Sequence, residues 1–96
     1  MDNFFVPYIG KKPASVCING HRLVILSHEK DILEDELDLL GADSIKKVKG
    51  IGSEQDQEKL FGKIARQVEG GVVIAPEGVG LRDILKNLES ELPWLQ

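Results

Sequence analysis

Two patterns of apolar positions alternate along this chain, one typical of strands and the other typical of helices. The strand pattern is a short run of consecutive or alternating apolar residues, and it occurs at 14–27, 44–51 and 72–75. The helix pattern, with apolar residues three or four positions apart, occurs at 28–40, 53–70 and 81–92. The sequence therefore predicts a single α/β domain over residues 1–96, with the element order ββαβαβα.

The segment 14–27 predicts a β-hairpin. Two apolar runs flank Asn19-Gly20, a dipeptide that favours a type I′ turn because both of its residues tolerate positive φ. A two-residue loop also fixes the register of the strands. The predicted opposite pairs are Val16 with Leu23, Cys17 with Arg22, and Ile18 with His21.

Capping residues predict the ends of the helices. Ser27 is a plausible N-cap for the helix over 28–40, and Gly41 stands where a helix C-terminal glycine belongs. Ser53 is the predicted N-cap of the second helix, which Gly70-Gly71 ends. The third helix follows the Pro76–Gly80 loop and ends before Pro93.

The polarity of each strand predicts its place in the sheet. Leu23–Leu26 and Val72–Ala75 are wholly apolar and favour interior positions, whereas the lysines in 44–51 favour a solvated edge. We therefore predict a mostly parallel four-stranded sheet with an antiparallel N-terminal hairpin strand, order 1-2-4-3, and helices on both faces. The alternative order 1-2-3-4 leaves one face of the apolar strands bare, and it predicts a dimer through that face.

Aromatic residues gather near the two ends of the chain. Phe4, Phe5 and Tyr8 lie within the first eight residues, and Trp94 lies near the last. Because termini are usually disordered unless something holds them, aromatic termini are expected to pack. We predict that residues 1–13 form an extended segment that packs on the domain or on a partner.

The carboxyl ends of the predicted parallel strands are the expected place for a ligand. Helix N-termini there offer N–H groups that suit an anion. One hypothesis is a small anionic ligand, phosphate or nucleotide, bound by Ser27, His28, Ser53, Glu77, Gly78, Val79 and Gly80. The Gly-x-Gly pairs at 50–52 and 78–80 lack the third glycine of a dinucleotide fingerprint, and the chain has no GxxxxGK[ST]. Tight turns are the simpler interpretation of both pairs.

No complete catalytic constellation is present in the sequence. His21 and His28 stand seven residues apart at opposite ends of one predicted strand, so they cannot chelate a metal together. Cys17 is predicted to be a buried or half-buried, inert thiol beside Arg22. An enzyme that uses His28 with Glu77 is the third-ranked hypothesis, and the preferred prediction involves no catalysis, no metal and no cofactor.

The charge distribution points to a protein partner. With 12 basic and 16 acidic residues, the net charge of −4 argues against nucleic acid, and no apolar run approaches the length of a membrane span. The single cysteine and the absence of a signal-peptide pattern favour a cytoplasmic location. The first helix is strongly acidic, which indicates either a basic partner or a solubilising surface.

The preferred prediction is therefore a small, non-catalytic protein-interaction or regulatory domain, with dimerisation left open. The alternative is a domain that binds a small anionic ligand at the carboxyl ends of the parallel strands. The predicted partner-binding residues are Phe4, Phe5, Tyr8, Glu34, Asp35, Asp38 and Trp94.

Overall fold

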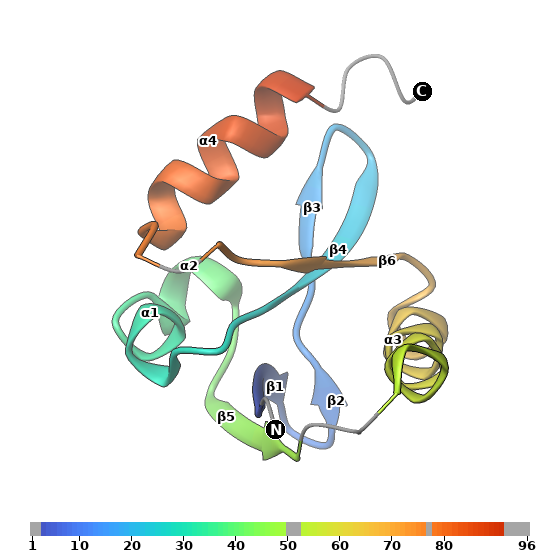
Figure 1. The fold of residues 1–96 in the computed structure, drawn as a ribbon. Coiled ribbons are helices and arrows are strands. Elements are labelled where there is room, and N and C mark those ends of the chain that lie inside the picture. The colour runs from blue at the N-terminus through green and yellow to red at the C-terminus, as the bar shows by residue number, and fades with distance from the viewer. Residues whose placement is uncertain (1–2, 50–52, 77, 92–96) are drawn as a thin grey trace.

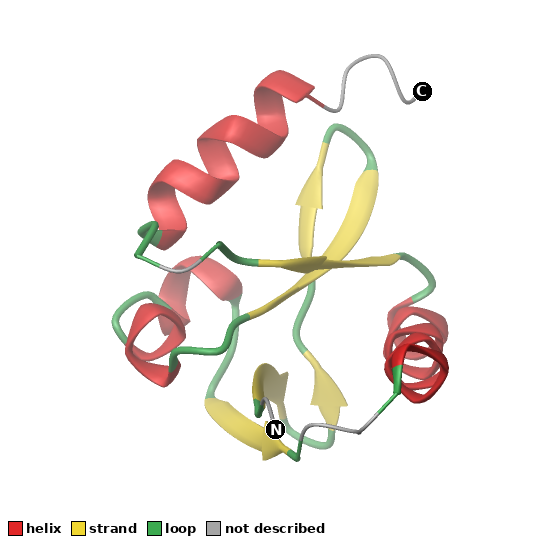
Figure 2. Cartoon of the chain, in the orientation of Figure 1, coloured by secondary structure: helices red, strands yellow, loops and turns green. Residues whose placement is uncertain are grey.

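A computed structural model describes residues 3–49, 53–76 and 78–91, which form a mixed α/β fold (Figures 1 and 2). The strands within these residues are β1 (Phe4–Ile9), β2 (Lys12–Pro13), β3 (Val16–Ile18), β4 (His21–Leu26), β5 (Ser44–Val48) and β6 (Gly71–Ile74). The helices are α1 (Lys30–Glu34), α2 (Leu37–Leu40), α3 (Glu54–Val68) and α4 (Leu81–Glu91).

The strands form two sheets of three rather than the predicted single sheet of four. One sheet has the order β2-β1-β5 and is antiparallel, and the other has the order β3-β4-β6. In the second sheet β6 runs parallel to β4, so two of the predicted pairings are present. The mostly parallel sheet of order 1-2-4-3 is nevertheless wrong, because β5 belongs to the other sheet.

The N-terminal segment explains the position of β5. Residues 4–9, predicted only to be extended, form the central strand of the first sheet, and β5 pairs with it antiparallel. The register places Phe4 opposite Val48 and Pro7 opposite Ile45, so the apolar positions of β5 pack beside those of β1. The apolar strand β1 thus pairs with β5 across the chain, and the predicted parallel crossover does not form.

The predicted hairpin is confirmed in detail. The opposite pairs are Val16–Leu23, Cys17–Arg22 and Ile18–His21. Asn19 and Gly20 have φ values of 52° and 85°, as a type I′ turn requires.

The predicted continuous helix over 28–40 is wrong, because the chain breaks it into α1 and α2. Glu36, between the two helices, has a φ of −129° and a ψ of 37°, outside the helical region. Acidic residues four positions apart, Asp31 with Asp35 and Glu34 with Asp38, disfavour an uninterrupted helix. The break still allows one leucine from each short helix to reach the core.

Three predicted caps have different outcomes. Gly41 ends α2 in the left-handed region with a φ of 65°, as predicted. The Ser53 Oγ accepts a hydrogen bond from the Asp56 N–H at 3.2 Å, which confirms it as the N-cap of α3. Ser27 is not the N-cap of α1, since Glu29 holds that position.

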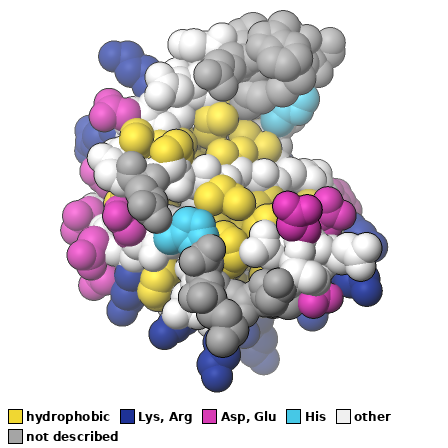
Figure 3. Space-filling view, in the orientation of Figure 1, with side chains coloured by type: hydrophobic (Ala, Val, Ile, Leu, Met, Phe, Trp, Pro, Cys, Tyr) yellow, Lys and Arg dark blue, Asp and Glu magenta, His cyan; other side chains and the backbone are white. Residues whose placement is uncertain are grey.

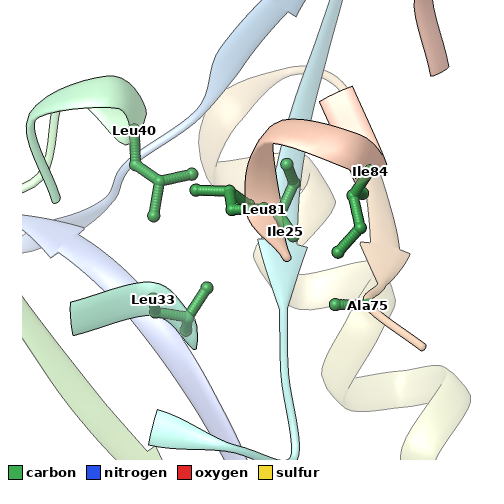
Figure 4. Close-up of a cluster of buried hydrophobic side chains, with 6 residues drawn as sticks. All are labelled: Ile25, Leu33, Leu40, Ala75, Leu81 and Ile84. Carbon is green, nitrogen blue, oxygen red and sulfur yellow. The ribbon is translucent and has the colours of Figure 1, made fainter. Parts of the chain in front are cut away.

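The core consists of two clusters on the two faces of β4. Ile25 points to one face and packs with residues from α1, α2, the β6–α4 loop and α4, as Figure 4 shows: Leu33, Leu40, Ala75, Leu81 and Ile84. Val24 and Leu26 point to the other face and pack with Val6 of β1 and with Ile64 and Val68 of α3. Because side chains alternate along a strand, β4 is buried on both faces and helices cover both.

The turn from α3 into β6 passes very close to β4. Glu69, the C-cap residue of α3, adopts a left-handed conformation with a φ of 55°. Gly70 follows, and a Cβ at this position would overlap the carbonyl oxygen of Arg22. Glycine is therefore required at position 70, because any side chain there would push the turn away from β4. Position 69 has the positive φ that usually favours glycine at a helix end, but it carries a glutamate.

We expect Gly70→Ala to lower the free energy of unfolding by about 2–3 kcal/mol, because β6 and β4 must move apart to admit the methyl group. Urea unfolding followed by circular dichroism measures the change. Gly62→Ala is the matched control: nothing lies within 4 Å of a Cβ there, in the middle of α3, and alanine should stabilise that helix by about 0.5–1 kcal/mol. Equal effects of the two substitutions would contradict the close approach at Gly70.

We expect Glu69→Gly to raise the free energy of unfolding by about 0.5 kcal/mol. The left-handed conformation costs an L-residue about 1–2 kcal/mol, and the greater freedom of glycine in the unfolded chain offsets part of the gain. The same urea experiment measures this change in the free energy of unfolding. Glu69→Ala removes the same carboxylate but keeps a Cβ, so a gain of equal size in that variant would show that charge, not backbone conformation, is responsible.

Candidate functional site

The predicted ligand site at the end of β4 contains the protein's own N-terminal strand. Ser27 is 1% exposed, and its main chain pairs with Phe5 of β1. The Phe5 N–H donates to the Ser27 carbonyl at 2.7 Å, and the Ser27 N–H donates to the Phe5 carbonyl at 3.1 Å. The Ser27 Oγ accepts from the Glu29 N–H at 2.9 Å. A ligand at Ser27 would have to compete with these contacts.

His28 also packs against the N-terminal strand. Its Nδ1 lies 3.2 Å from the carbonyl oxygen of Asn3, and since a carbonyl only accepts, Nδ1 carries the proton in this hydrogen bond. The imidazole lies on the ring of Phe4 at a centroid distance of 4.5 Å, and Phe4 meets Phe61 of α3 edge-on at 5.4 Å. His28 is half-buried in this aromatic stack rather than a solvated residue of a helix.

The remaining predicted ligand residues are not brought together around Ser27 and His28. Gly78, Val79 and Gly80 form the loop between β6 and α4, with Gly78 at a φ of 76° and Val79 packed on the Ile25 cluster. Ser53 caps α3, which covers the opposite face of β4 from α4. Glu77 lies outside the described residues. The observed geometry of 78–80 is that of a turn.

The aromatic residues predicted to meet a partner contribute to the protein's own core. Phe4 is 3% exposed, Phe5 packs on the Ile25 cluster, and Tyr8 packs on the cluster around Val24. The Lys46 ammonium of β5 lies 5.3 Å from the centroid of the Tyr8 ring. Trp94 lies outside the described residues.

The predicted acidic partner residues lie together on an exposed surface. Glu34, Asp35 and Asp38 line a shallow hollow formed by residues 34–39 and by Arg82 of α4. The Arg82 Nε lies 3.1 Å from a carboxylate oxygen of Glu36, and the Lys30 ammonium lies 3.9 Å from a carboxylate oxygen of Glu34. Both ion pairs are solvent-accessible, so each contributes little to stability.

The other side chains that could carry chemistry do not form a site together in the described residues. Cys17 is exposed on β3, so the prediction of a buried or half-buried thiol is wrong: its side chain points away from the face that Val16 and Ile25 bury. Across residues 3–49, 53–76 and 78–91, no three His, Cys, Asp or Glu side chains are placed to hold a metal ion. None of the helices in that part of the chain is both long and apolar enough to cross a membrane.

The exposed edge of β6 is the feature that sequence reasoning missed. Within the described residues β6 is an end strand with β4 as its neighbour, although its apolar sequence predicted an interior position. The Ala75 N–H donates to the Leu26 carbonyl at 2.8 Å. This hydrogen bond determines which peptide groups of β6 face β4, because they alternate along a strand. The peptide groups of Gly71, Val73 and Ala75 therefore face β4, and those of Val72 and Ile74 face the open edge.

A groove whose described lining residues are all uncharged runs beside this edge. Its walls come from β6, from the loop after it and from one side of α4: Val73, Ile74, Pro76, Val79, Ile84, Asn87 and Leu88. The Ile74 side chain is 40% exposed. Figure 3 shows hydrophobic side chains gathered across the middle of this face, where Figure 1 draws β6, with charged groups towards its margins.

The other sheet edges are protected in a way that β6 is not. β5 carries exposed Lys46 and Lys47, and the two-residue β2 carries exposed Lys12, which discourage a further strand. β3 is only three residues long. β6 has neither a charge nor a proline. The alternative strand order predicted a partner on a bare face of the sheet, and it did not predict this edge. The sequence signal for the edge is the absence of charge and proline from 71–74.

We expect Ser27→Ala to cost about 2 kcal/mol of stability, because the Glu29 N–H loses its acceptor in a part-buried hydrogen bond. Ser53→Ala, at the exposed cap of α3, should cost about 1 kcal/mol or less and serves as the control. Chemical unfolding of both variants provides the comparison. An unchanged stability for Ser27→Ala would mean that this hydroxyl is not structural, and would restore interest in it as a ligand group.

The chain matches no model of a known protein family, no curated protein and no solved structure. No family is therefore assigned, and a function has to follow from the residues of this chain.

Proposed function

We propose that this chain is a non-catalytic protein-interaction domain that binds an extended segment of its partner along β6. The observation that carries the proposal is the apolar, uncharged edge of β6, which no other described strand covers. An exposed edge of this kind is a template for strand addition, in which a peptide continues the sheet.

The edge offers both parts of such a recognition mode. The outward peptide groups of Val72 and Ile74 supply donors and acceptors for the main chain of the partner. The groove between β6 and α4 supplies an apolar surface for alternate side chains of the added strand. Main-chain hydrogen bonds then contribute affinity, and the groove selects apolar side chains.

A cytoplasmic location, a protein rather than a nucleic-acid partner, and the absence of a cofactor belong to the same proposal. The single cysteine supports the location, and the net charge of −4 supports a protein partner. The incomplete dinucleotide fingerprints support the absence of a cofactor. The predicted anionic ligand at Ser27, His28 and 78–80 stays a prediction, and binding there would compete with the contacts of Ser27 and His28 to Phe5 and Asn3.

A library of random peptides displayed on phage tests the proposal, because it samples many extended segments without requiring the partner itself. We expect selection on the wild-type protein to enrich peptides with alternating apolar residues. Their affinity should fall at least tenfold for Ile74→Lys, which places a charge on the edge, and for Ile74→Pro, which removes one outward N–H donor. Neither substitution removes a hydrogen bond to β4, because the peptide groups of Ile74 point away from it.

Ile9→Lys is the matched control, since Ile9 is 54% exposed and lies in β1, in the other sheet. This variant should bind the selected peptides as the wild type does. Circular dichroism spectra and melting temperatures establish that all variants fold. Equal binding by the wild type and both Ile74 variants would contradict a binding site on β6. No enrichment from protein that sedimentation shows to be monomeric would contradict it as well.

A further inference from the structure

We propose that the segment added to β6 is the β6 strand of a second copy of this chain, in an antiparallel arrangement around a two-fold axis. The inference rests on the proposed function, because it assumes that the β6 edge accepts a strand. It goes further by naming the partner. The two three-stranded sheets β3-β4-β6 then join into one continuous sheet.

The outward peptide groups fix the register of this pairing. In an antiparallel pair, two opposite residues exchange both of their hydrogen bonds, so outward-facing residues must stand opposite each other. In the register that we propose, Val72 lies opposite Ile74 of the second copy, and Ile74 lies opposite its Val72. The two Val73 residues then face each other across the two-fold axis. Two other registers also place outward-facing residues opposite each other. Pairing Ile74 with its own copy would place Val72 opposite Pro76, which has no N–H to donate. Pairing Val72 with its own copy would place Ile74 opposite Gly70, whose N–H already donates to the Ala65 carbonyl.

The same register buries the exposed side chains of the strand. Val72 and Ile74 lie on the face of the sheet that α3 covers, since Val72 packs on the cluster of Val24, Leu26, Ile64 and Val68. Each exposed Ile74 would therefore meet the Val72 side chain of the second copy, and the two Val73 side chains would meet on the α4 face. Apolar pairs of this kind stabilise adjacent strands.

Charge explains why a second copy suits this edge. Two chains of net charge −4 repel each other, but none of the described residues that line the groove is charged. Within residues 71–75, the proposed register therefore pairs two β6 edges without placing like charges opposite each other. A β5 edge would place the ammonium groups of Lys46 and Lys47 against those of its copy, which disfavours pairing there.

The two-fold axis also places the helices favourably. An axis perpendicular to the joined sheet leaves each helix on its own face, so α4 approaches its copy on one face and α3 approaches its copy on the other. Leu88 and Asn87 of α4, which already line the groove, would then lie near the junction. The interface extends beyond the four residues of β6.

Sedimentation velocity over a dilution series of the full chain tests the association. We expect the wild-type protein to shift from the 10.6 kDa of one chain towards twice that mass as its concentration rises. Ile74→Pro and Ile74→Lys should remain at the mass of one chain over the same range, and the Ile9→Lys control should associate like the wild type. If either Ile74 variant fails to fold, the other one decides the result.

Disulfide trapping tests the register. In a Cys17→Ser background, Val73→Cys places two thiols across the axis, where Cα atoms about 4.5 Å apart permit a disulfide. Oxidised glutathione should convert this variant to a covalent dimer with the release of reduced glutathione. Ile74→Cys is the control, because its two copies lie diagonally, about 7–8 Å apart, and should cross-link at least tenfold more slowly.

The outcomes separate the two proposals. A wild-type chain that stays monomeric at every concentration overturns pairing with a second copy, while peptide binding that depends on Ile74 would still support a β6 site for another protein. A dimer that persists in both folded Ile74 variants overturns β6 as the interface. A dimer that cross-links through Ile74→Cys faster than through Val73→Cys overturns the register.

Discussion

The rest of the structure depends on β4, which is buried on both faces and hydrogen-bonded along both edges. Val24, Ile25 and Leu26 are fully buried, with side chains that alternate between the two core clusters. The peptide groups alternate as well. Those of Val24 and Leu26 face β6, and those of Leu23, Ile25 and Ser27 face the side shared by β3 and then β1. The strands β3, β6 and β1 and the helices are placed by which side of β4 they meet, and β2 and β5 are placed by their pairing with β1.

Local chemistry was enough to predict the hairpin and two helix ends, and the apolar character of two strands was enough to predict one contact between distant segments. The Asn19-Gly20 turn determines the hairpin register because few other backbone conformations suit both residues. The Ser53 cap and the Gly41 helix end follow from single side chains and a single positive φ. The parallel contact of β6 with β4 follows from two apolar strands that need the same core.

The parts that could not be predicted depend on contacts between distant segments. Whether residues 4–9 form a terminal tail or a central strand depends on a partner strand, β5, that lies far along the chain at 44–48. At the break at Asp35 and Glu36, like charges four positions apart disfavour a continuous helix, and Leu33 and Leu40 are buried on either side of it. Apolar periodicity cannot resolve such competitions, because both outcomes bury the same residues.

The same contacts between distant segments move the candidate site from the carboxyl end of β4 to the edge of β6. In an open parallel sheet the carboxyl end of β4 would border a crevice, but here β1 pairs with Ser27 and Phe4 packs on His28. The chain thus covers one side of β4 with its own N-terminal strand. β5 pairs with β1 instead of extending the sheet beyond β6. Among the described strands, the run at 71–74 consequently keeps an open edge. An apolar run of this kind indicates burial, but it does not indicate whether the covering strand belongs to the same molecule.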